Sequence, residues 1–558
     1  MTNEEIAEKL KWYADLSELH NGNPFKIKSY AAASFRIDKL TTPLEGLSIQ
    51  ELEKLEGVGK SVAAKVHQLT TTGSFDELDE LLEATPNGVQ QLFLVKGIGP
   101  KKIAYIWNEL GIESPGELLY ACNENRLAQA KGFGLKTQES VKKSIEFLFA
   151  NAHKFHFARV EQLAKELLSD LTKQTWVIEA AFSGELSRKC EVLTSLDFII
   201  STNEPITRCA NQLSVLLNGA VHTNGNSLSL KLNENIPVQL LITSPESFVK
   251  EKFEASAHPH HIEILQSYLP NWNHVTVAHE EEIYAKANLQ FIPLEMREGL
   301  FEFEQAKNNS IPTLIELSDL KGILHNHTTY SDGLNTLEEM AVYCKELGYE
   351  YLGICDHSKS AFYAKGLHEE TIIKQHAEID ALNKKLGPFK IFKGIESDIL
   401  NDGALDYSDA VLASFDFVVA SVHSNLKMSE EKAMSRLIKA IENPYTTILG
   451  HPTGRLLLMR EGYPVDHKKI IDACAANGVV IEINAHPYRL DLDWRHIHYA
   501  LEKGVMLSIN PDAHHVDGYH DMYYGVCVAR KGGLHQAMCF NALNREQIAD
   551  YFNKRKPK

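Results

Sequence analysis

The stretch ILHNHTTYSDG, residues 323–333, places two histidines and one aspartate within eight residues. Side chains two residues apart in a strand point to the same face, so His325 and His327 are expected to reach one point. Asp332 can return to that point from the adjoining loop. Imidazole nitrogen and carboxylate oxygen are ligands of zinc, manganese or iron. Because a His-x-His pair can also be surface or core decoration, the pair alone does not establish a metal site.

Short apolar, β-branched runs come after this stretch and end in the same kinds of residue. The run ends are Asp356 and His357, Glu396, His423, His451, Glu482 and Asn484, and Asp512 and His514. Helix-like segments with apolar residues at three- and four-residue spacing lie between them, and Gly348 and Gly478 are their closing signals. Together with the opening stretch these six make seven strand-like runs separated by helices, which predict a parallel sheet, most simply a closed barrel with its working residues at the C-terminal strand ends.

Histidines bonded to backbone or carboxylates that cap helices would explain these residues one at a time. They would not explain why the residues fall at the same end of almost every strand, so we expect a metal site. The motifs HNHTTYSD, CDHS, GIES, SVHS, GHPTGR and PDAH, in this order, resemble the PHP (polymerase and histidinol phosphatase) domain over roughly residues 320–558.

This resemblance implies a distorted barrel of seven β/α units that binds three divalent metal ions, Mn²⁺, Zn²⁺ or Fe²⁺. The nine ligand positions of the family correspond to His325, His327, Asp332, His357, Glu396, His423, His451, Asp512 and His514, and none is substituted. Neighbouring cations would lower the pKa of water and hold both the phosphate and its leaving oxygen, which predicts phosphoester hydrolysis. These nine residues are therefore also the predicted catalytic residues.

Two cations close to the ligand motifs are candidates to bind the phosphate. Arg455 comes shortly after His451, and Lys365 lies in the loop after His357. Guanidinium and ammonium groups suit phosphate oxygens, although a helix-terminal salt bridge is the alternative for Arg455. Cys355 lies beside Asp356, where we expect it to serve packing.

Composition limits the class of protein. A chain of 558 residues is too long for one core, and 44% hydrophobic with 23% charged residues is typical of a soluble globular protein. No apolar run reaches the about 18 residues of a membrane span, and MTNEEIAEKLKWY reads as a polar helix rather than a signal peptide. Eight cysteines without a Cys-x-x-Cys pair favour reduced thiols and a cytoplasmic location. A formal charge of −17 indicates that any DNA contact is local.

Three similar pieces recur in the mostly helical residues 1–150. They are LEGVGKSVAAKV (55–66), VKGIGPKKIAYI (95–106) and AKGFGLKTQESV (130–141). Two glycines allow a tight turn with positive φ, and the backbone N–H groups at the start of the next helix can bind one phosphate. A single Gly-x-Gly would be read as a helix cap, but three in register resemble the helix-hairpin-helix motif, which grips the DNA backbone without reading sequence. The predicted DNA-binding residues are Gly57, Gly59, Lys60, Gly97, Gly99, Lys101, Gly132 and Gly134.

The opening segment, residues 6–37, resembles the small N-terminal domain of family X DNA polymerases, and the second and third hairpins resemble the next subdomain of that family. In relatives with 5′-deoxyribose phosphate lyase activity, a lysine in the helix after the first hairpin forms the Schiff base. Lys65 occupies that position here, and Lys60 is close enough to help make it nucleophilic. The alternative is a solvated or phosphate-contacting lysine.

Residues 155–310 resemble the family X palm and thumb, with one departure. The family has a Gly-Ser turn, an Arg pair, two aspartates one residue apart and a third on a neighbouring strand, and these carboxylates hold two Mg²⁺ ions. Here Gly184 is followed by Glu185, Ser187 precedes Arg188, Ser195 replaces the first aspartate, Asp197 remains, and Gln239 stands in the third place. With one carboxylate left, we expect no Mg²⁺ pair in the palm and no polymerase activity, unless Glu185 or Glu191 substitutes.

Three smaller segments also carry predictions. The thumb segment KFEASAHPHH lacks the family's Thr-Gly-Ser turn, and its His258, His260 and His261 are expected in a surface loop rather than at a metal. The segment of residues 284–322, which contains IPLEMRE, resembles the family connector and predicts an ordered linker packed between domains. The basic tail, residues 551–558, is expected to be disordered.

The predicted fold is multidomain: all-α helix-hairpin-helix parts at 1–80 and 81–150, an α+β palm at 151–245, a thumb with connector at 246–310, and the PHP barrel at 320–558. The whole chain resembles bacterial family X DNA polymerases with a C-terminal PHP domain. That resemblance implies a monomeric DNA-repair phosphodiesterase, a 3′–5′ exonuclease and possibly an apurinic-site endonuclease, acting on gapped or nicked DNA or 3′ ends. The alternatives are a gap-filling polymerase, a DNA-binding scaffold with structural metals, and a small-molecule phosphoesterase.

Overall fold

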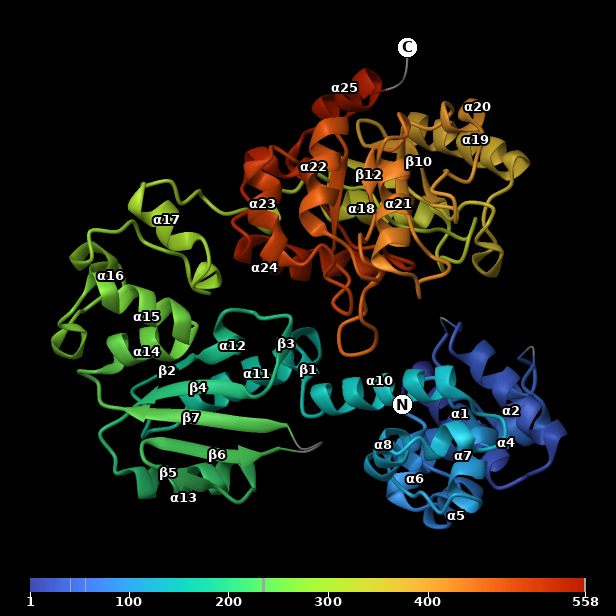
Figure 1. Ribbon diagram of the computed structural model, residues 1–558, viewed down its shortest axis with the longest axis horizontal. Coiled ribbons are helices and arrows are strands. Elements are labelled where there is room, and N and C mark those ends of the chain that lie inside the picture. The colour runs from blue at the N-terminus through green and yellow to red at the C-terminus, as the bar shows by residue number, and fades with distance from the viewer. Residues whose placement is uncertain (41, 56, 233–235, 556–558) are drawn as a thin grey trace. The chain divides into compact units, whose positions relative to one another are not determined.

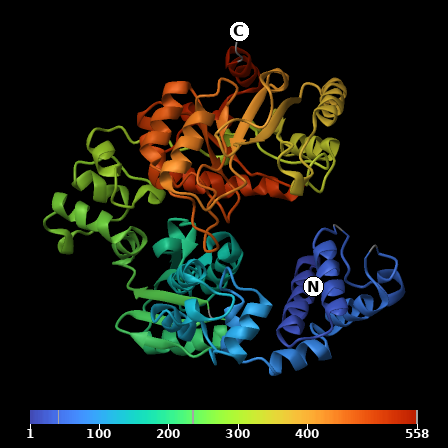
Figure 2. The ribbon, with the colours of Figure 1, turned by 45° about the vertical axis from the view of Figure 1, so that its right-hand side comes forward.

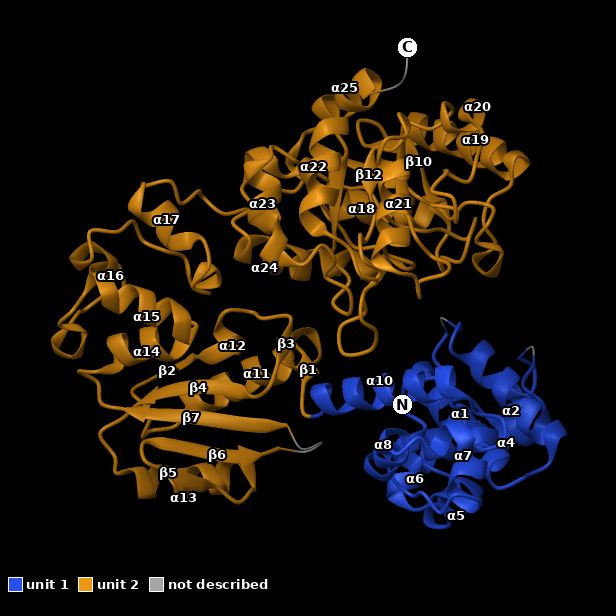
Figure 3. Ribbon diagram, in the orientation of Figure 1, with its two compact units in different colours: residues 1–152 blue, residues 153–558 orange. Residues whose placement is uncertain are grey.

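The computed structural model describes residues 1–40, 42–55, 57–232 and 236–555, which form two compact units, residues 1–152 and 153–558 (Figure 3). The described part of the first unit is helical. Its helices are α1 (Asn3–Leu19), α2 (Pro24–Ile37), α3 (Ile49–Leu52), α4 (Lys60–Thr72), α5 (Asp76–Glu83), α6 (Asn87–Leu92), α7 (Pro100–Asn108), α8 (Pro115–Asn123), α9 (Arg126–Gln129) and α10 (Leu135–Asn151). One core of buried side chains runs from Ile6 to Ile145, so the ranges 1–80 and 81–150 pack as one body.

The second unit begins with a five-stranded sheet whose strand order is β2-β4-β7-β6-β5. The bounds are β2 (Glu179–Phe182), β4 (Leu196–Ser201), β5 (His222–Asn224), β6 (Ser227–Lys231) and β7 (Pro237–Thr243), with α11 (Phe157–Thr172) and α13 (Ile206–Leu217) beside them in Figure 1. The short strands β1 (Phe155–His156) and β3 (Val192–Leu193) pair with each other, and α12 (Gly184–Ser187) lies between β2 and β3 in the chain. Because β4 and β7 are parallel neighbours, Asp197 stands directly opposite Gln239.

Four helices with a core of their own come after the sheet: α14 (Phe248–Ser256), α15 (Pro259–Tyr268), α16 (Glu281–Lys286) and α17 (Glu302–Lys307). The expectation that His258, His260 and His261 form a surface loop is wrong. Pro259 supplies the first residue of a helix, His258 caps it, and His261 turns into the core with no exposed surface. His261 Nδ1 lies 2.8 Å from Glu302 Oε1 and its Nε2 lies 2.9 Å from the Tyr284 hydroxyl.

The connector is ordered, as the sequence predicted. Arg297 is buried, donates to the Ile292 carbonyl oxygen at 3.0 Å, and forms an ion pair with Glu280 at 2.7 Å. Glu298 is also buried and forms ion pairs with Arg188 of the palm and Lys531 of the barrel. These contacts fix the connector against its neighbours on both sides.

Seven parallel strands form the C-terminal part, in the order β14-β13-β12-β11-β10-β9-β8. They are β8 (Gly322–Ile323), β9 (Tyr351–Ile354), β10 (Lys390–Asp398), β11 (Phe417–Ser421), β12 (Ile448–Leu449), β13 (Val480–Asn484) and β14 (Leu507–Asn510). His327 N donates to the Ala513 carbonyl oxygen at 2.8 Å and Asp512 N to the His325 carbonyl oxygen at 3.1 Å, so the segments after β8 and β14 nearly close the barrel.

Helices surround these strands (Figure 2). They are α18 (Leu337–Glu346), α19 (Glu369–Leu386), α20 (Asp409–Leu412), α21 (Glu430–Ile441), α22 (His467–Asn477), α23 (Ile497–Glu502), α24 (Met522–Lys531) and α25 (Arg545–Arg555). The predicted stop signals are confirmed, because Gly348 and Gly478 come after α18 and α22 with positive φ. The tail is not disordered through residue 555, since α25 continues to Arg555 and Phe552 stacks on Phe417; residues 556–558 lie outside the described part.

No helix within the described ranges is long and apolar enough to cross a membrane.

Candidate metal centre

The nine residues predicted as metal ligands come together at the C-terminal end of the barrel. His325 and His327 come after β8, His357 after β9, Glu396 lies in β10, His423 and His451 come after β11 and β12, Asp512 and His514 after β14, and Asp332 stands in the loop after β8. Parallel strands end on the same side of a barrel, which is why residues far apart in the chain can meet there.

Glu396 lies at the middle of this group and is fully buried. Its Oε1 atom lies 3.2 Å from His325 Nε2, 3.1 Å from His423 Nε2 and 3.1 Å from His451 Nε2, and its Oε2 atom lies 2.8 Å from His357 Nδ1. Burial alone would raise the pKa of Glu396, but His423, His325 and His357 outweigh it and hold the pKa well below its ordinary value. The carboxylate is therefore ionised.

Eight of the nine side chains fall into three overlapping groups whose ligand atoms lie within 4.8 Å of one another. The groups are His327, Asp332, His357 and His514; His325, His327 and Asp512; and His357, Glu396 and His423. His327 and His357 each belong to two groups, as expected where cations share neighbouring ligands.

The site also carries buried polar atoms without a hydrogen-bond partner. They include His327 Nδ1, His451 Nδ1 and Asp332 Oδ1. An unpaired buried polar atom costs free energy, so such atoms are rare unless something else satisfies them. Divalent cations would satisfy these nitrogen and oxygen atoms, and the mixed donor set suits Mn²⁺, Zn²⁺ or Fe²⁺. The residues present therefore fit a metal cluster.

Acidic residues behind the histidines hold their rings in place. His325 Nδ1 lies 2.6 Å from Glu482 Oε2, and Glu482 Oε1 accepts from the His451 backbone N–H at 3.2 Å. Burial lowers the pKa of His325, but Glu482 and other carboxylates outweigh it and raise that pKa well above its ordinary value. Asp398 is hydrogen-bonded to His423 Nδ1. Such partners orient the ligands and tune their basicity.

The sequence placed Glu482 at a strand end without giving it a role, and it did not single out Asp398. A signal for Asp398 was its position two residues after the predicted ligand Glu396 in β10, on the same face of the strand. Asp356, another strand-end residue, fixes the loop that carries Asp332: it accepts from Thr328 N at 2.8 Å and from Ser331 Oγ at 2.5 Å.

The two predicted phosphate-binding cations differ in their surroundings. Arg455 donates to the Arg489 carbonyl oxygen at 2.9 Å and pairs with Asp493 at 2.5 Å, which favours the salt-bridge alternative. Lys365 is exposed and has no ion pair within the described part of the chain. Arg489, which the sequence did not single out, brings its Nε to 3.8 Å from Asp512 Oδ2 and is a better placed guanidinium.

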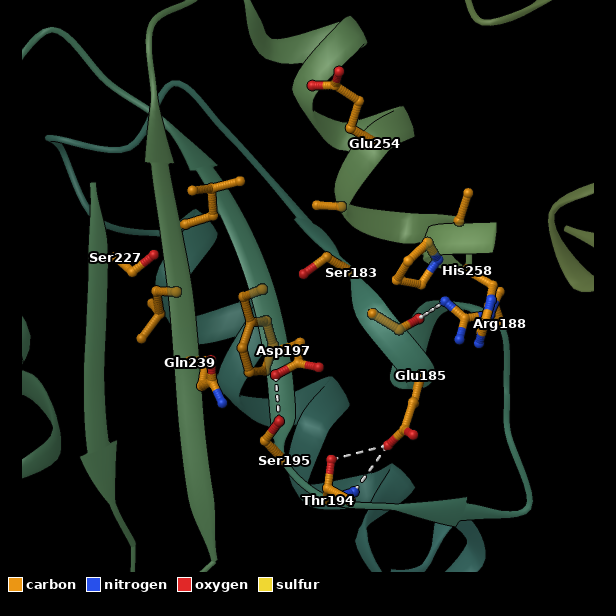
Figure 4. A pocket seen from close by; sticks show the side chains of 17 residues that line it. Ser183, Glu185, Arg188, Thr194, Ser195, Asp197, Ser227, Gln239, Glu254 and His258 are labelled. Atoms are coloured by element: carbon orange, nitrogen blue, oxygen red, sulfur yellow. Dashed lines mark hydrogen bonds between the residues drawn. The ribbon is translucent and has the colours of Figure 1, made fainter. Parts of the chain in front are cut away.

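A separate cavity, about 480 Å³ in volume, lies in the palm-like sheet region (Figure 4). Asp197 points into it and accepts from Ser195 Oγ at 2.5 Å, while Gln239 faces it from β7. Burial raises the pKa of Asp197. Glu185 accepts from Thr194 N at 3.0 Å and also lines the cavity.

The other proposed substitute, Glu191, is engaged elsewhere. It accepts from Trp494 Nε1 at 3.2 Å and pairs with Arg495 at 3.4 Å on the barrel side. Arg188 lines the palm cavity and donates to the Gly184 and Ser256 carbonyl oxygens at 3.1 and 2.8 Å. Gly184 itself has φ +58°, and an added Cβ would lie 2.2 Å from Asp197 Oδ2.

The three hairpins share one geometry. The first glycine of each has positive φ: +80° at Gly57, +96° at Gly97 and +86° at Gly132. The second glycine, Gly59, Gly99 or Gly134, is the N-cap of α4, α7 or α10, and none of the three has a side-chain cap. A Cβ added at these N-caps would meet open space. Exposed backbone N–H groups at three helix starts are suited to phosphate oxygens.

The lysines near the hairpins differ in their exposure and in their ion pairs. Lys60 and Lys101 are exposed beside the N-caps, and Lys101 lies 3.8 Å from Glu18. Lys65 is mostly buried, forms an ion pair with Glu77 and lies over the Phe75 ring at 5.1 Å. These contacts favour a structural lysine, and the lyase role stays a prediction.

Hairpins in one unit and a ligand-lined barrel in the other define a helix-hairpin-helix protein with a PHP-type metal site. Family models agree: "Helix-hairpin-helix domain" matches residues 1–75, "SAM-like Helix-hairpin-helix tandem" residues 89–146, and "PHP domain" residues 324–486. The DNA polymerase/3′-5′ exonuclease PolX of Bacillus subtilis is 32% identical over 575 residues, covering 99% of this chain and 100% of that protein. The chain belongs to the PolX family of bacterial family X DNA polymerases with a PHP domain.

The barrel alone is similar to shorter proteins. A probable phosphatase of Caldanaerobacter subterraneus is 29% identical over 201 residues, which is 34% of this chain and 74% of that protein. A probable phosphatase of Thermoanaerobacter sp. is 27% identical over 252 residues, which is 43% of this chain and 98% of that protein. The shared segment is thus a metal-dependent phosphoester-hydrolysing barrel that also occurs without the preceding domains.

Proposed function

We propose that this protein is a DNA-repair 3′–5′ exonuclease whose PHP barrel hydrolyses phosphodiesters with divalent metal ions. The observation that carries the proposal is the convergence of nine imidazole and carboxylate side chains, several with unpaired buried atoms, in a chain that also carries three Gly-x-Gly hairpins at helix starts. The relative from Bacillus subtilis is named as a DNA polymerase and 3′–5′ exonuclease, and the exonuclease part of that name supports the same activity here.

The role that we assign to each residue follows from its position. The nine ligands would hold the cations, which when bound supply Lewis acidity and neutralise phosphate charge. Glu482 and Asp398 hold His325 and His423 in place, while Arg489 at the edge of the cluster is the residue we assign to the phosphate. The hairpins position the DNA through its backbone. Apurinic-site cleavage would use the same centre, because it breaks the same kind of bond.

We propose further that three ions occupy the centre, with Mn²⁺, Zn²⁺ or Fe²⁺ as candidates, because the three ligand groups overlap only at single residues. We also assign a monomer acting in the cytoplasm on gapped DNA, nicked DNA or 3′ ends. The eight cysteines support this location, since all eight are free thiols.

Loss of polymerase activity is part of the proposal. Among the described residues that line the palm cavity, Asp197 is the one aspartate, its neighbours Ser195 and Gln239 are neutral, and Glu185 is turned toward Thr194. Within the described ranges, groups of three metal-ligating side chains occur in the barrel alone. Glu254 also lines the cavity, but it accepts a hydrogen bond from Trp272 Nε1, which leaves Asp197 as the acid we expect to face a cation. One such carboxylate is too few for a Mg²⁺ pair.

One incubation separates the candidate functions: purified protein, end-labelled gapped DNA, nucleotides and Mn²⁺. We expect the labelled strand to shorten from its 3′ end. Lengthening would favour the gap-filling polymerase, and no change with metal still bound would favour a scaffold. Faster hydrolysis of a phosphate monoester than of DNA would favour a small-molecule phosphoesterase, and each of these results would contradict the proposal.

A further inference from the structure

Two aromatic side chains stand exposed on the loop after His357. Phe362 is 85% exposed and Tyr363 is 62% exposed, whereas Ala361 and Ala364 on either side of them are buried. Large apolar rings normally turn inward, so two adjacent ones in solvent call for a reason. This pair lies beside the metal centre, because the Tyr363 and His357 ring centroids are 6.4 Å apart.

The loop is held firmly rather than loosely. Leu367 N donates to the His357 carbonyl oxygen at 2.8 Å, and Gly366 N donates to the Ala361 carbonyl oxygen at 3.1 Å. Ser360 N donates to Asp406 at 2.6 Å and its hydroxyl donates to Asp398, the partner of His423, at 2.7 Å. These hydrogen bonds hold the backbone that carries the two rings beside the centre.

The carboxylates of the centre act on the Tyr363 phenol. Partial burial, followed by Asp398, Glu396 and Asp332, raises its pKa above the ordinary value. The Phe362 ring lies next to it, with centroids 6.2 Å apart in an edge arrangement. Lys365, nearby in the same loop, adds a positive charge that no described acidic group neutralises. Two rings and one cation beside a phosphodiester-cleaving site are the elements of a single-strand platform.

We propose that Phe362 and Tyr363 stack on unpaired bases at the 3′ end of the DNA, with Lys365 at the adjoining backbone, so that the enzyme selects frayed or single-stranded ends. Paired bases are already stacked and cannot offer their faces in this way. A protein partner is disfavoured, since two rings are far smaller than a specific interface. This inference rests on the proposed exonuclease function.

The first test measures base stacking in the absence of cleavage. A single strand with 2-aminopurine as its 3′-terminal base is titrated with protein in EDTA, where no turnover can occur, and the base fluorescence is recorded. We expect saturable quenching by the wild type, little quenching by the Phe362→Ala/Tyr363→Ala double variant, and restored quenching with Phe362→Tyr/Tyr363→Phe. Ile373→Ala, which removes a 70% exposed apolar side chain from the same barrel, should behave as wild type.

The second test measures the rate of cleavage. In Mn²⁺, kcat/KM of the double Ala variant on a single strand should fall roughly tenfold, within the range that one lost base–aromatic stack produces, and mainly through KM. On a strand whose 3′-terminal nucleotide lacks its base, the same variant should lose much less. Equal losses on both strands, or unchanged quenching, would overturn the inference. If the wild type quenches the probe but cleaves no DNA, the exonuclease proposal fails while the platform stands.

Discussion

Glu396 contacts more of the predicted metal ligands than a single pairing would require. Four histidine nitrogens lie within 3.2 Å of its two oxygens, and burial removes water as a substitute partner. Glu396→Gln keeps the size and removes the negative charge. We expect the metal content, measured by elemental analysis, to drop. Nuclease activity should drop with it, by more than the roughly 10- to 100-fold that changes to ligand-orienting residues cost. Glu370→Gln, an exposed change at the start of α19, is the matched control, and a Glu396→Gln protein with full metal content and activity would contradict the assignment.

A stacked histidine pair away from the centre predicts a pH effect on stability. The His467 and His496 rings lie 3.8 Å apart, and burial followed by the charge of His467 lowers the pKa of His496 to about 4. The folded state therefore binds a proton less readily than the unfolded state, whose pKa is about 6.5. Stability is retained above about pH 6.5 and falls as the pH drops toward 4.

His496→Gln removes this contribution. Between about pH 7.5 and about pH 5.5 in EDTA, the melting temperature of the variant should fall less than that of the wild type, by the equivalent of less than about 1 kcal/mol, because partial exposure screens the group. Parallel pH profiles for the two proteins would show that His496 titrates normally in the folded state.

Among the elements, the hairpins give the cleanest test because their glycines separate two roles. Gly99 has φ −111°, which any residue adopts, and a Cβ there meets open space. Gly99→Ala should therefore cost no more than about 1 kcal/mol of stability, the usual cost of alanine at an N-cap, but hinder a phosphate at the start of α7, weakening DNA binding several-fold in a fluorescence titration. Gly116→Ala in α8, where nothing closer than 4.0 Å meets the new methyl group, is the control. Equal DNA affinity of the two variants would show that this hairpin does not contact DNA.

Much of both elements and site could be predicted from the sequence because their signals are local. Strand period and strand-end position bring His325 and Glu396 to one edge, and a Gly-x-Gly before an amphipathic run identifies each hairpin. What escaped prediction depends on packing between distant segments. Glu482 meets His325 across 157 positions, and Arg489 reaches Asp512 only through the fold of its loop. His261 looked like a surface residue because its partners, Glu302 and Tyr284, come much later in the chain.

In the second unit as a whole, a buried charge cluster joins three parts of the chain. Glu298 of the connector pairs with Arg188 of the palm at 2.9 Å and with Lys531 of the barrel, and all three are buried. Burial raises the pKa of Glu298, but the two cations outweigh it and lower that pKa. The single carboxylate thus compensates two buried positive charges.

Glu298→Gln should accordingly destabilise the unit by about 3–5 kcal/mol, since it leaves both cations uncompensated. Lys531→Met should cost much less, because the Arg188–Glu298 pair stays balanced. Urea denaturation of both variants beside Glu502→Gln, which changes an exposed acid paired with His498, measures the difference. A larger loss of unfolding free energy for Lys531→Met than for Glu298→Gln would contradict the view that Glu298 compensates both cations.

The most direct test of the central claim compares two aspartates in one time course on 3′-recessed, 5′-labelled DNA with Mn²⁺ and nucleotides. Asp512→Asn removes a carboxylate from the barrel, and Asp197→Asn removes a carboxylate from the palm cavity. We predict that shortening of the strand disappears in Asp512→Asn and continues at the wild-type rate in Asp197→Asn, with both proteins still binding DNA. Shortening that survives in Asp512→Asn, or wild-type strand extension that Asp197→Asn abolishes, would contradict the account.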